Sequence, residues 1–284
     1  MVVYRFILLL LVAGVTPALA QPGSGNGTGA GNGAGAPTGQ ALVDRALANE
    51  LSAAEDQSHP MRYQLRKTSP RLTTTKEIME TKDGEVARLM AAGGQPLSPA
   101  AEANEEARLN ALRADPAKQQ RRKQSEDADA GRALKVLRAL PSAFIYQDAG
   151  PGEEPAGKVE KFTFRPNPKF EPLDLETQVL PAMTGEIWID PVHARVVRLE
   201  GHLQQDVNFG WGILGRLNKG GWIAIEQAEV GEGQWRTVRF QMQMSGRVVF
   251  KARVFDTTEE QTRYAPVPAG MGYQTAIGML LAGR

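Results

Sequence analysis

Residues 185–200, GEIWIDPVHARVVRLE, contain two short runs in which apolar side chains recur at every second position. Ile187 and Ile189 do so in the first run, and Val197 and Leu199 do so in the second. Successive side chains of a strand point to opposite faces of a sheet, so this spacing predicts strands buried on one side. The Asp-Pro pair between the runs is a turn signal. The stretch therefore predicts two neighbouring antiparallel strands.

Runs of the same kind recur on both sides of this stretch. In the second half of the chain they cover residues 143–146, 157–165, 176–180, 184–190, 194–201, 204–209, 221–230, 234–245 and 247–256. Three earlier runs cover residues 61–66, 73–80 and 85–91. Runs separated by Gly, Pro or Asp without helices between them are typical of an antiparallel meander. So many strands cannot form one flat sheet. We expect a mainly β protein of the α+β class, with a strongly curved antiparallel sheet or an incomplete β-barrel.

The apolar positions of these runs form the candidate ligand-binding face. Its members are Ile187, Ile189, Val197, Leu199, Phe209, Trp211, Ile223, Ile225, Phe240, Met242 and Phe250. A face of this size has to be covered, because large exposed apolar patches are rare on monomers. Two uses remain open. The face can be an ordinary core under helices, or part of it can line a groove for an acyl chain, with Trp and Met side chains as lining groups.

Helical patterns precede and interrupt the predicted strands. Residues 40–56 carry apolar side chains at three- and four-residue spacing, which predicts a helix. Ser98-Pro99 and Asp115-Pro116 each combine a capping side chain with proline at the first helical position, and so begin two further helices. A third helix of this group, at about 129–140, is more apolar and is expected to pack on the sheet. We interpret residues 98–140 as a charged helical insertion and expect helices to plug the sheet.

The N-terminal region predicts export. Residues 1–20 have an early cation, an apolar run and small residues at Ala18 and Ala20, which are the parts of a signal peptide cleaved near Ala20. Residues 21–39 are rich in glycine and predict a disordered tether. We therefore expect a signal peptide at 1–20, the tether at 21–39 and a single domain at 40–284, located in the periplasm or secreted and peripheral to a membrane at most.

Composition excludes several classes of partner and chemistry. The chain has no cysteine, so it forms no disulfide, no thiolate metal site and no lipid-modified cysteine. It has 33 Lys and Arg against 32 Asp and Glu. Removal of Arg5 with the signal peptide leaves no basic excess, which argues against a nucleic-acid partner.

No constellation in the sequence argues for catalysis. Residues 210–215 match G-x-G-x-x-G, but the glycines that follow leave no room for the helix of a dinucleotide site, so we interpret the match as a turn between strands. Asp190 and His193 offer two ligands where zinc needs three or four, and Asp190 is better suited to capping its turn. Neither Ser142 nor Ser245 stands in a nucleophile elbow. We expect no enzyme activity, no metal and no cofactor.

Three stretches together resemble a known family. They are KFTFRPNP at 161–168, GEIWIDP at 185–191 and RLEG at 198–201. They resemble secreted bacterial proteins of the outer-membrane lipoprotein-sorting superfamily, called LolA-like or LolB-like. The resemblance covers under half of the mature chain, and its motif is structural. It implies an incomplete barrel plugged by helices, with an apolar cavity that in the superfamily takes up lipoprotein acyl chains, while some relatives act as periplasmic sensors.

These observations lead to two functional hypotheses. The first is a non-enzymatic extracytoplasmic carrier or sensor that binds lipid or lipoprotein acyl chains in an apolar cavity. The alternative is an interaction or adaptor protein of the cell envelope, with a fully plugged sheet, no ligand and a protein partner for its charged insertion.

Overall fold

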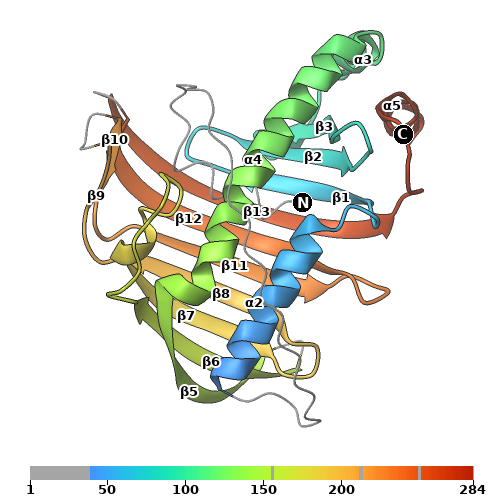
Figure 1. Cartoon of the computed structure of the whole chain (residues 1–284). Helices are drawn as coiled ribbons and strands as arrows, with labels where there is room; N and C mark the ends of the chain where they lie inside the picture. Colours follow the sequence, from blue (N-terminus) through green and yellow to red (C-terminus); the bar gives the residue numbers. More distant parts are fainter. Residues whose placement is uncertain (1–38, 155–156, 211–213, 249–250, 284) are drawn as a thin grey trace.

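The architecture is one curved antiparallel sheet with helices on one of its faces (Figure 1). The structure is a computed structural model, and it describes residues 39–154, 157–210, 214–248 and 251–283. Within them the sheet has 13 strands in the order β4-β3-β2-β1-β13-β12-β11-β8-β7-β6-β5, while β10 pairs with β12 and β9. The sheet is not closed, since β4 and β5 each have one neighbour. This confirms the predicted open, curved sheet of an α+β protein.

The strands form long hairpins that follow the chain closely. Their bounds are β1 Met61–Thr68, β2 Thr73–Met79, β3 Val86–Ala92, β4 Gln95–Pro96, β5 Phe144–Glu154, β6 Gly157–Pro166, β7 Met183–Asp190, β8 Arg195–Leu203, β9 Val207–Phe209, β10 Gly215–Leu217, β11 Trp222–Glu229, β12 Trp235–Val248 and β13 Lys251–Pro266. Strand β13 returns to pair with β1, which joins the early strands to the late ones in a single sheet.

Two of the helices begin where the capping signals predict, and a third begins where the apolar spacing predicts. Helix α2 (Gln40–Glu55) buries Leu42, Val43, Ala46 and Leu47 against the sheet. At the start of α3 (Pro99–Arg113) the Ser98 side chain accepts a hydrogen bond from the Ala101 amide. Asp115 caps the next helix, α4 (Pro116–Ala143), by accepting from the Lys118 amide at 2.9 Å. Figure 1 shows α2 and the second half of α4 lying across the same face of the sheet.

Three details of the sequence-based prediction are wrong. Residues 116–143 form one helix rather than two, because no helix-ending residue interrupts residues 124–129, and the Lys123–Asp127 pair at 2.7 Å supports the continuous helix. The predicted strand at 176–180 is absent: residues 176–179 form turns that lead into the 3₁₀ helix η2 (Leu180–Ala182). Helix α5 (Tyr273–Ala282) was not expected from strand alternation.

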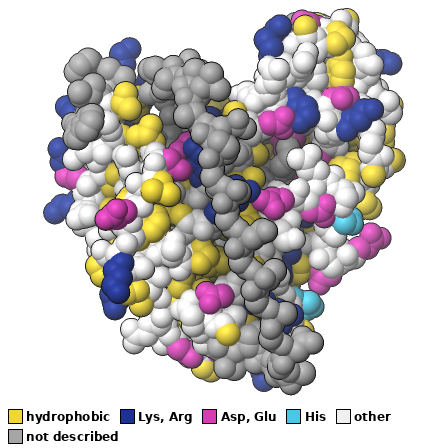
Figure 2. All heavy atoms as spheres, in the orientation of Figure 1, with side chains coloured by type: hydrophobic (Ala, Val, Ile, Leu, Met, Phe, Trp, Pro, Cys, Tyr) yellow, Lys and Arg dark blue, Asp and Glu magenta, His cyan; other side chains and the backbone are white. Residues whose placement is uncertain are grey.

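Helix α5 completes a second core at the early end of the sheet. Its buried residues Tyr273, Ala276, Ile277 and Leu280 recur at helical spacing and pack with Leu109 and Leu112 of α3 and with Met79 and Val86 of the sheet. The insertion is thus tied into the fold by apolar burial at α3. On the face seen in Figure 2, the outer end of the insertion carries acidic and basic side chains side by side. Among the described residues, no helix is both long and apolar enough to cross a membrane.

Candidate functional site: an apolar cavity under two helices

A cavity of about 150 Å³ lies between the sheet and helices α2 and α4. Helix α2 contributes Leu47, Glu50, Ala53 and Ala54, and α4 contributes Ala133, Val136, Leu137 and Leu140. The sheet and the η2 region supply Phe144, Tyr146, Phe164, Val179, Leu180, Met183, Arg195, Val196, Leu199, Ile223, Ile225, Gln227, Trp235, Arg236, Thr237 and Phe240. The lining is mostly apolar, as expected for a small-molecule site.

One row of side chains crosses five strands of the sheet, and three of its members, Leu199, Ile225 and Phe240, line the cavity. Phe162 pairs with Ile187, Ile187 with Leu199, Leu199 with Ile225, and Ile225 with Phe240. Directly opposite residues of paired strands share a face, so the row places all five on the helix-covered side. Alternation in the sequence predicts this shared face for the four members that belong to the candidate set.

The structure divides the candidate set among several places. Leu199, Ile223, Ile225 and Phe240 line the cavity. Ile187 and Ile189 are fully buried beneath α2, in a cluster with its apolar face. Phe209 and Met242 lie in the main core cluster of the sheet. Trp211 and Phe250 lie outside the described residues.

Val197 lies apart from the cavity because the strand register shifts. Trp188 pairs with Arg198 but Ile189 pairs with Val196, so Val197 has no opposite residue on β7. An extra residue of this kind is a β-bulge, and it reverses the alternation beyond it. Val196 therefore takes the position on the cavity wall, while Val197 packs with Val159, Trp235 and Trp188.

One end of the cavity is polar and is built around Glu50 of α2. Its carboxylate accepts hydrogen bonds from Arg195 Nε at 2.8 Å and Nη2 at 3.1 Å, from the Val196 amide at 3.0 Å and from Gln227 Nε2 at 3.0 Å. The donors come from β8 and β11, so this network joins the helix to the sheet at the cavity's edge. Glu50 and Arg195 are both largely buried, at 10% and 13% side-chain exposure.

Two further polar residues at this end belong to the start of β12. Glu226 pairs with Arg239 but Gln227 pairs with Thr237, so Val238 is left unpaired and the phase of β12 changes there. Thr237 consequently lies on the same face as Phe240 and lines the cavity, and Arg236 lines it as well. The candidate set takes Phe240 and Met242 from one alternation of this run, which assigns Thr237 to the opposite face, and it therefore missed Thr237. The signal for it is the competing alternation of Trp235 and Thr237.

Tyr146 stands in the cavity wall with its hydroxyl directed to backbone. The Tyr146 hydroxyl donates to the Leu140 carbonyl at 3.1 Å, which ties β5 to the end of α4. Burial, and after it the negative charge of Asp44, raises the pKa of the Tyr146 hydroxyl above its ordinary value. A neutral tyrosine at this point keeps that part of the wall uncharged.

Two groups outside the cavity have residue types used in catalysis, but their geometry does not support it. In the exposed turn after α2, Ser58 Oγ and Asp56 Oδ2 both lie 2.8 Å from the same ring nitrogen of His59, Nδ1, whereas a triad uses the two ring nitrogens separately. Asp190 accepts from the Val192 and His193 amides, which confirms its capping role.

In the described part of the chain the glycine motif leads into a strand, and residues 211–213 of the motif lie outside the described residues. Gly215 opens the short strand β10, which pairs with β9, where a dinucleotide site would require a helix. In the described ranges no three His, Asp or Glu side chains converge in a way that could hold a metal ion.

Comparison with known proteins leaves the family open. No family model and no curated protein matches the chain. A proposed outer membrane lipoprotein-sorting protein domain from Vibrio parahaemolyticus is 10% identical with a TM-score of 0.30, over 85% of this chain and 100% of that chain. The protein MucB, in its complex with MucA(peri), is 11% identical with a TM-score of 0.22, over 78% of this chain and 98% of that chain. At these scores neither structure identifies the family.

Proposed function

We propose that this protein is a non-enzymatic extracytoplasmic carrier or sensor that holds the hydrocarbon part of a lipid or lipoprotein acyl group in the cavity under α2 and α4. The observation that carries the proposal is the cavity itself, with a wall of Leu199, Ile223, Ile225 and Phe240 and a polar end at Glu50. An apolar pocket with a few convergent polar groups is the usual form of a small-molecule site.

The size of the cavity sets what can enter without movement. At about 150 Å³ it matches a dry cavity lined by Leu, Ile and Phe that accepts a benzene-sized group, and it is smaller than the roughly 300 Å³ at the low end of drug-sized sites. The cavity as it stands therefore holds only part of an acyl chain. Burial of a 16-carbon chain releases roughly 12 kcal/mol at ~0.8 kcal/mol per methylene, and association removes about 4 to 15 kcal/mol. Weak, exchangeable binding follows, as a carrier needs.

The proposed location rests on the N-terminal sequence. The signal-peptide pattern of residues 1–20, followed by the glycine-rich stretch 21–39, supports export and a flexible attachment. The resemblance of three stretches to lipoprotein-sorting proteins agrees with an envelope role. Lipids or an envelope protein are the proposed partners.

A cavity-filling substitution tests the proposal. Ile225→Trp adds bulk inside the cavity and is expected to weaken binding of a fluorescent fatty acid at least tenfold. The matched control is Ile145→Trp on β5, because Ile145 is 37% exposed and is not part of the lining. Leu137→Phe on α4 is a second filling variant should Ile225→Trp fail to fold by near-UV circular dichroism.

The result also separates the two hypotheses. Equal binding by Ile225→Trp and the control would place the fatty acid elsewhere and overturn the proposal. An unmodified protein that binds no fatty acid at all would instead favour an adaptor with a filled sheet, which the small volume of the cavity leaves as the second candidate.

A further inference from the structure

We propose that the ligand of the cavity carries a carboxylate, and that Thr237 and Arg236 bind this head group while the hydrocarbon lies against Leu199, Ile225 and Phe240. This inference rests on the proposed function and names the chemical class of its ligand.

Thr237 offers a hydrogen-bond donor that the fold does not use. Its side chain is 2% exposed and lines the cavity, and its Oγ1 has no hydrogen-bond partner among the described residues. Buried polar groups are nearly always paired, because an unpaired one loses its bond to water without replacement. Valine has a similar shape and would fill the same place without this cost. A ligand atom that accepts from the hydroxyl explains a threonine here.

Arg236 brings a positive charge to the same end of the cavity. Its guanidinium donates to Gln234 Oε1 at 3.3 Å, to the Trp235 carbonyl at 3.1 Å and to the His59 carbonyl at 2.8 Å. None of these acceptors is a carboxylate, so they orient the group without neutralising it. Its Nε is buried and has no acceptor within the described ranges. An anionic ligand group would supply both the missing acceptor and the missing charge.

The remaining charges of the lining balance each other. Glu50 is paired with Arg195, and its carboxylate already accepts four hydrogen bonds. The charged residues of the lining are Glu50, Arg195 and Arg236, which sum to +1. One net positive charge together with an unused hydroxyl matches a head group that has one negative charge and accepts hydrogen bonds. A carboxylate has both properties, whereas an ammonium group would add a second positive charge to a lining that already carries one.

The arrangement along β12 places head and hydrocarbon in order. Thr237 and Phe240 lie on the same face, with the bulge at Val238 between them. Phe240 continues into the apolar row through Ile225 and Leu199. A chain whose carboxylate meets Thr237 therefore runs directly onto the apolar wall.

The test compares two small probes on variants of one residue. Hexanoate and benzene are titrated into the full protein and followed by NMR chemical shifts. Thr237→Val is expected to weaken hexanoate about tenfold or more, because one hydrogen bond to a charged group is lost, and to leave the benzene affinity within about twofold. Thr237→Ser keeps the hydroxyl and is expected to retain hexanoate binding. Arg236→Gln is expected to weaken hexanoate and to leave benzene unchanged.

The outcomes separate this inference from the proposed function. Suppose that benzene binds and that hexanoate binds Thr237→Val and the unmodified protein with equal affinity. This result overturns the head-group site alone. Failure of both probes to bind overturns the proposed cavity as well. Thermal unfolding without ligand gives an independent measurement, since Thr237→Val is expected to raise Tm by removing an unpaired buried hydroxyl. A lower Tm would show that the hydroxyl has a structural partner and would overturn the inference.

Discussion

Removal of the Glu50 carboxylate is expected to destabilise the fold where α2 meets the sheet. In Glu50→Ala the four hydrogen bonds that the carboxylate accepts are lost, and the Arg195 guanidinium, at 13% side-chain exposure, stays largely buried without its partner. Breaking a buried pair in this way costs about 3 to 5 kcal/mol, mainly because a charge is left uncompensated. The free energy of unfolding should fall by that amount.

Urea unfolding followed by circular dichroism measures this loss. With an m-value of about 3 kcal/mol per M, a loss of 3 to 5 kcal/mol lowers the midpoint by roughly 1 to 1.7 M. In Glu50→Ala/Arg195→Ala the second substitution removes the charge that the first left unpaired. The double variant should therefore lose less stability than the sum of the two single variants.

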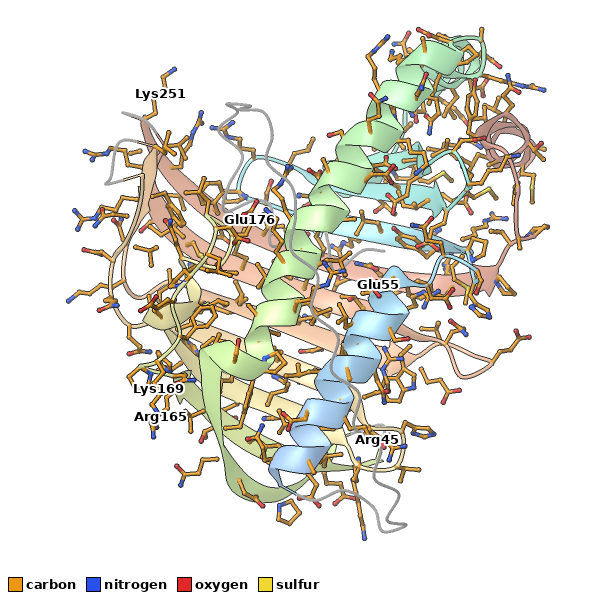
Figure 3. All side chains as sticks on the ribbon, in the orientation of Figure 1. Arg45, Glu55, Arg165, Lys169, Glu176 and Lys251 are labelled. Carbon is orange, nitrogen blue, oxygen red and sulfur yellow. The ribbon has the colours of Figure 1, made fainter. Side chains whose placement is uncertain are left out.

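Helix α2 also provides the matched control. Glu55, labelled in Figure 3 at the end of α2 beside α4, pairs with Arg138, but both side chains are about half exposed. Exposed pairs contribute about 0 to 1 kcal/mol, so Glu55→Ala should move the midpoint little. A Glu50→Ala midpoint equal to that of Glu55→Ala would refute the reasoning, because burial and donor number would then make no difference.

Three further predictions concern pH and glycine. Because the folded pKa of Tyr146 is raised, its stabilising effect is present below about pH 10 and is lost as pH rises further, so Tyr146→Phe should flatten the alkaline fall in Tm. Hydrogen bonds from the Ser58 side chain and amide, then from His59, lower the pKa of Asp56 from 3.8 to about 2. The stability that these bonds provide is present above about pH 4 and is lost as the pH falls towards 2. Asp56→Asn should therefore remove this acid dependence from the urea unfolding midpoints. A Cβ on Gly185 would lie 1.8 Å from the Glu200 carbonyl oxygen, so Gly185→Ala should lower the free energy of unfolding by about 1 to 3 kcal/mol or more, as measured in urea. A Cβ on Gly131 in α4 would meet no atom within 4 Å, so Gly131→Ala should raise the free energy of unfolding by about 0.5 to 1 kcal/mol.

Much of the fold could be predicted because it follows from local patterns. The capping pairs at Ser98 and Asp115 begin α3 and α4 at the expected residues, since a cap depends only on its own turn. Alternation likewise predicts that Ile187, Leu199, Ile225 and Phe240 share a face, and paired registers bring them into one row. The site was harder to predict. Four candidate residues line the cavity, but its polar end joins Glu50 of α2 to residues of β8, β11 and β12 that lie more than a hundred positions later in the sequence.

The sequence by itself determined that the chain builds a curved antiparallel sheet with one apolar face, because period-two alternation is a property of each strand alone. Only the tertiary structure decided which neighbours line the cavity. Bulges at Val197 and Val238 arise where a strand is matched to its partner, and each reverses the alternation on one side of the extra residue. Val196 and Thr237 reach the cavity for that reason, while Val197 does not.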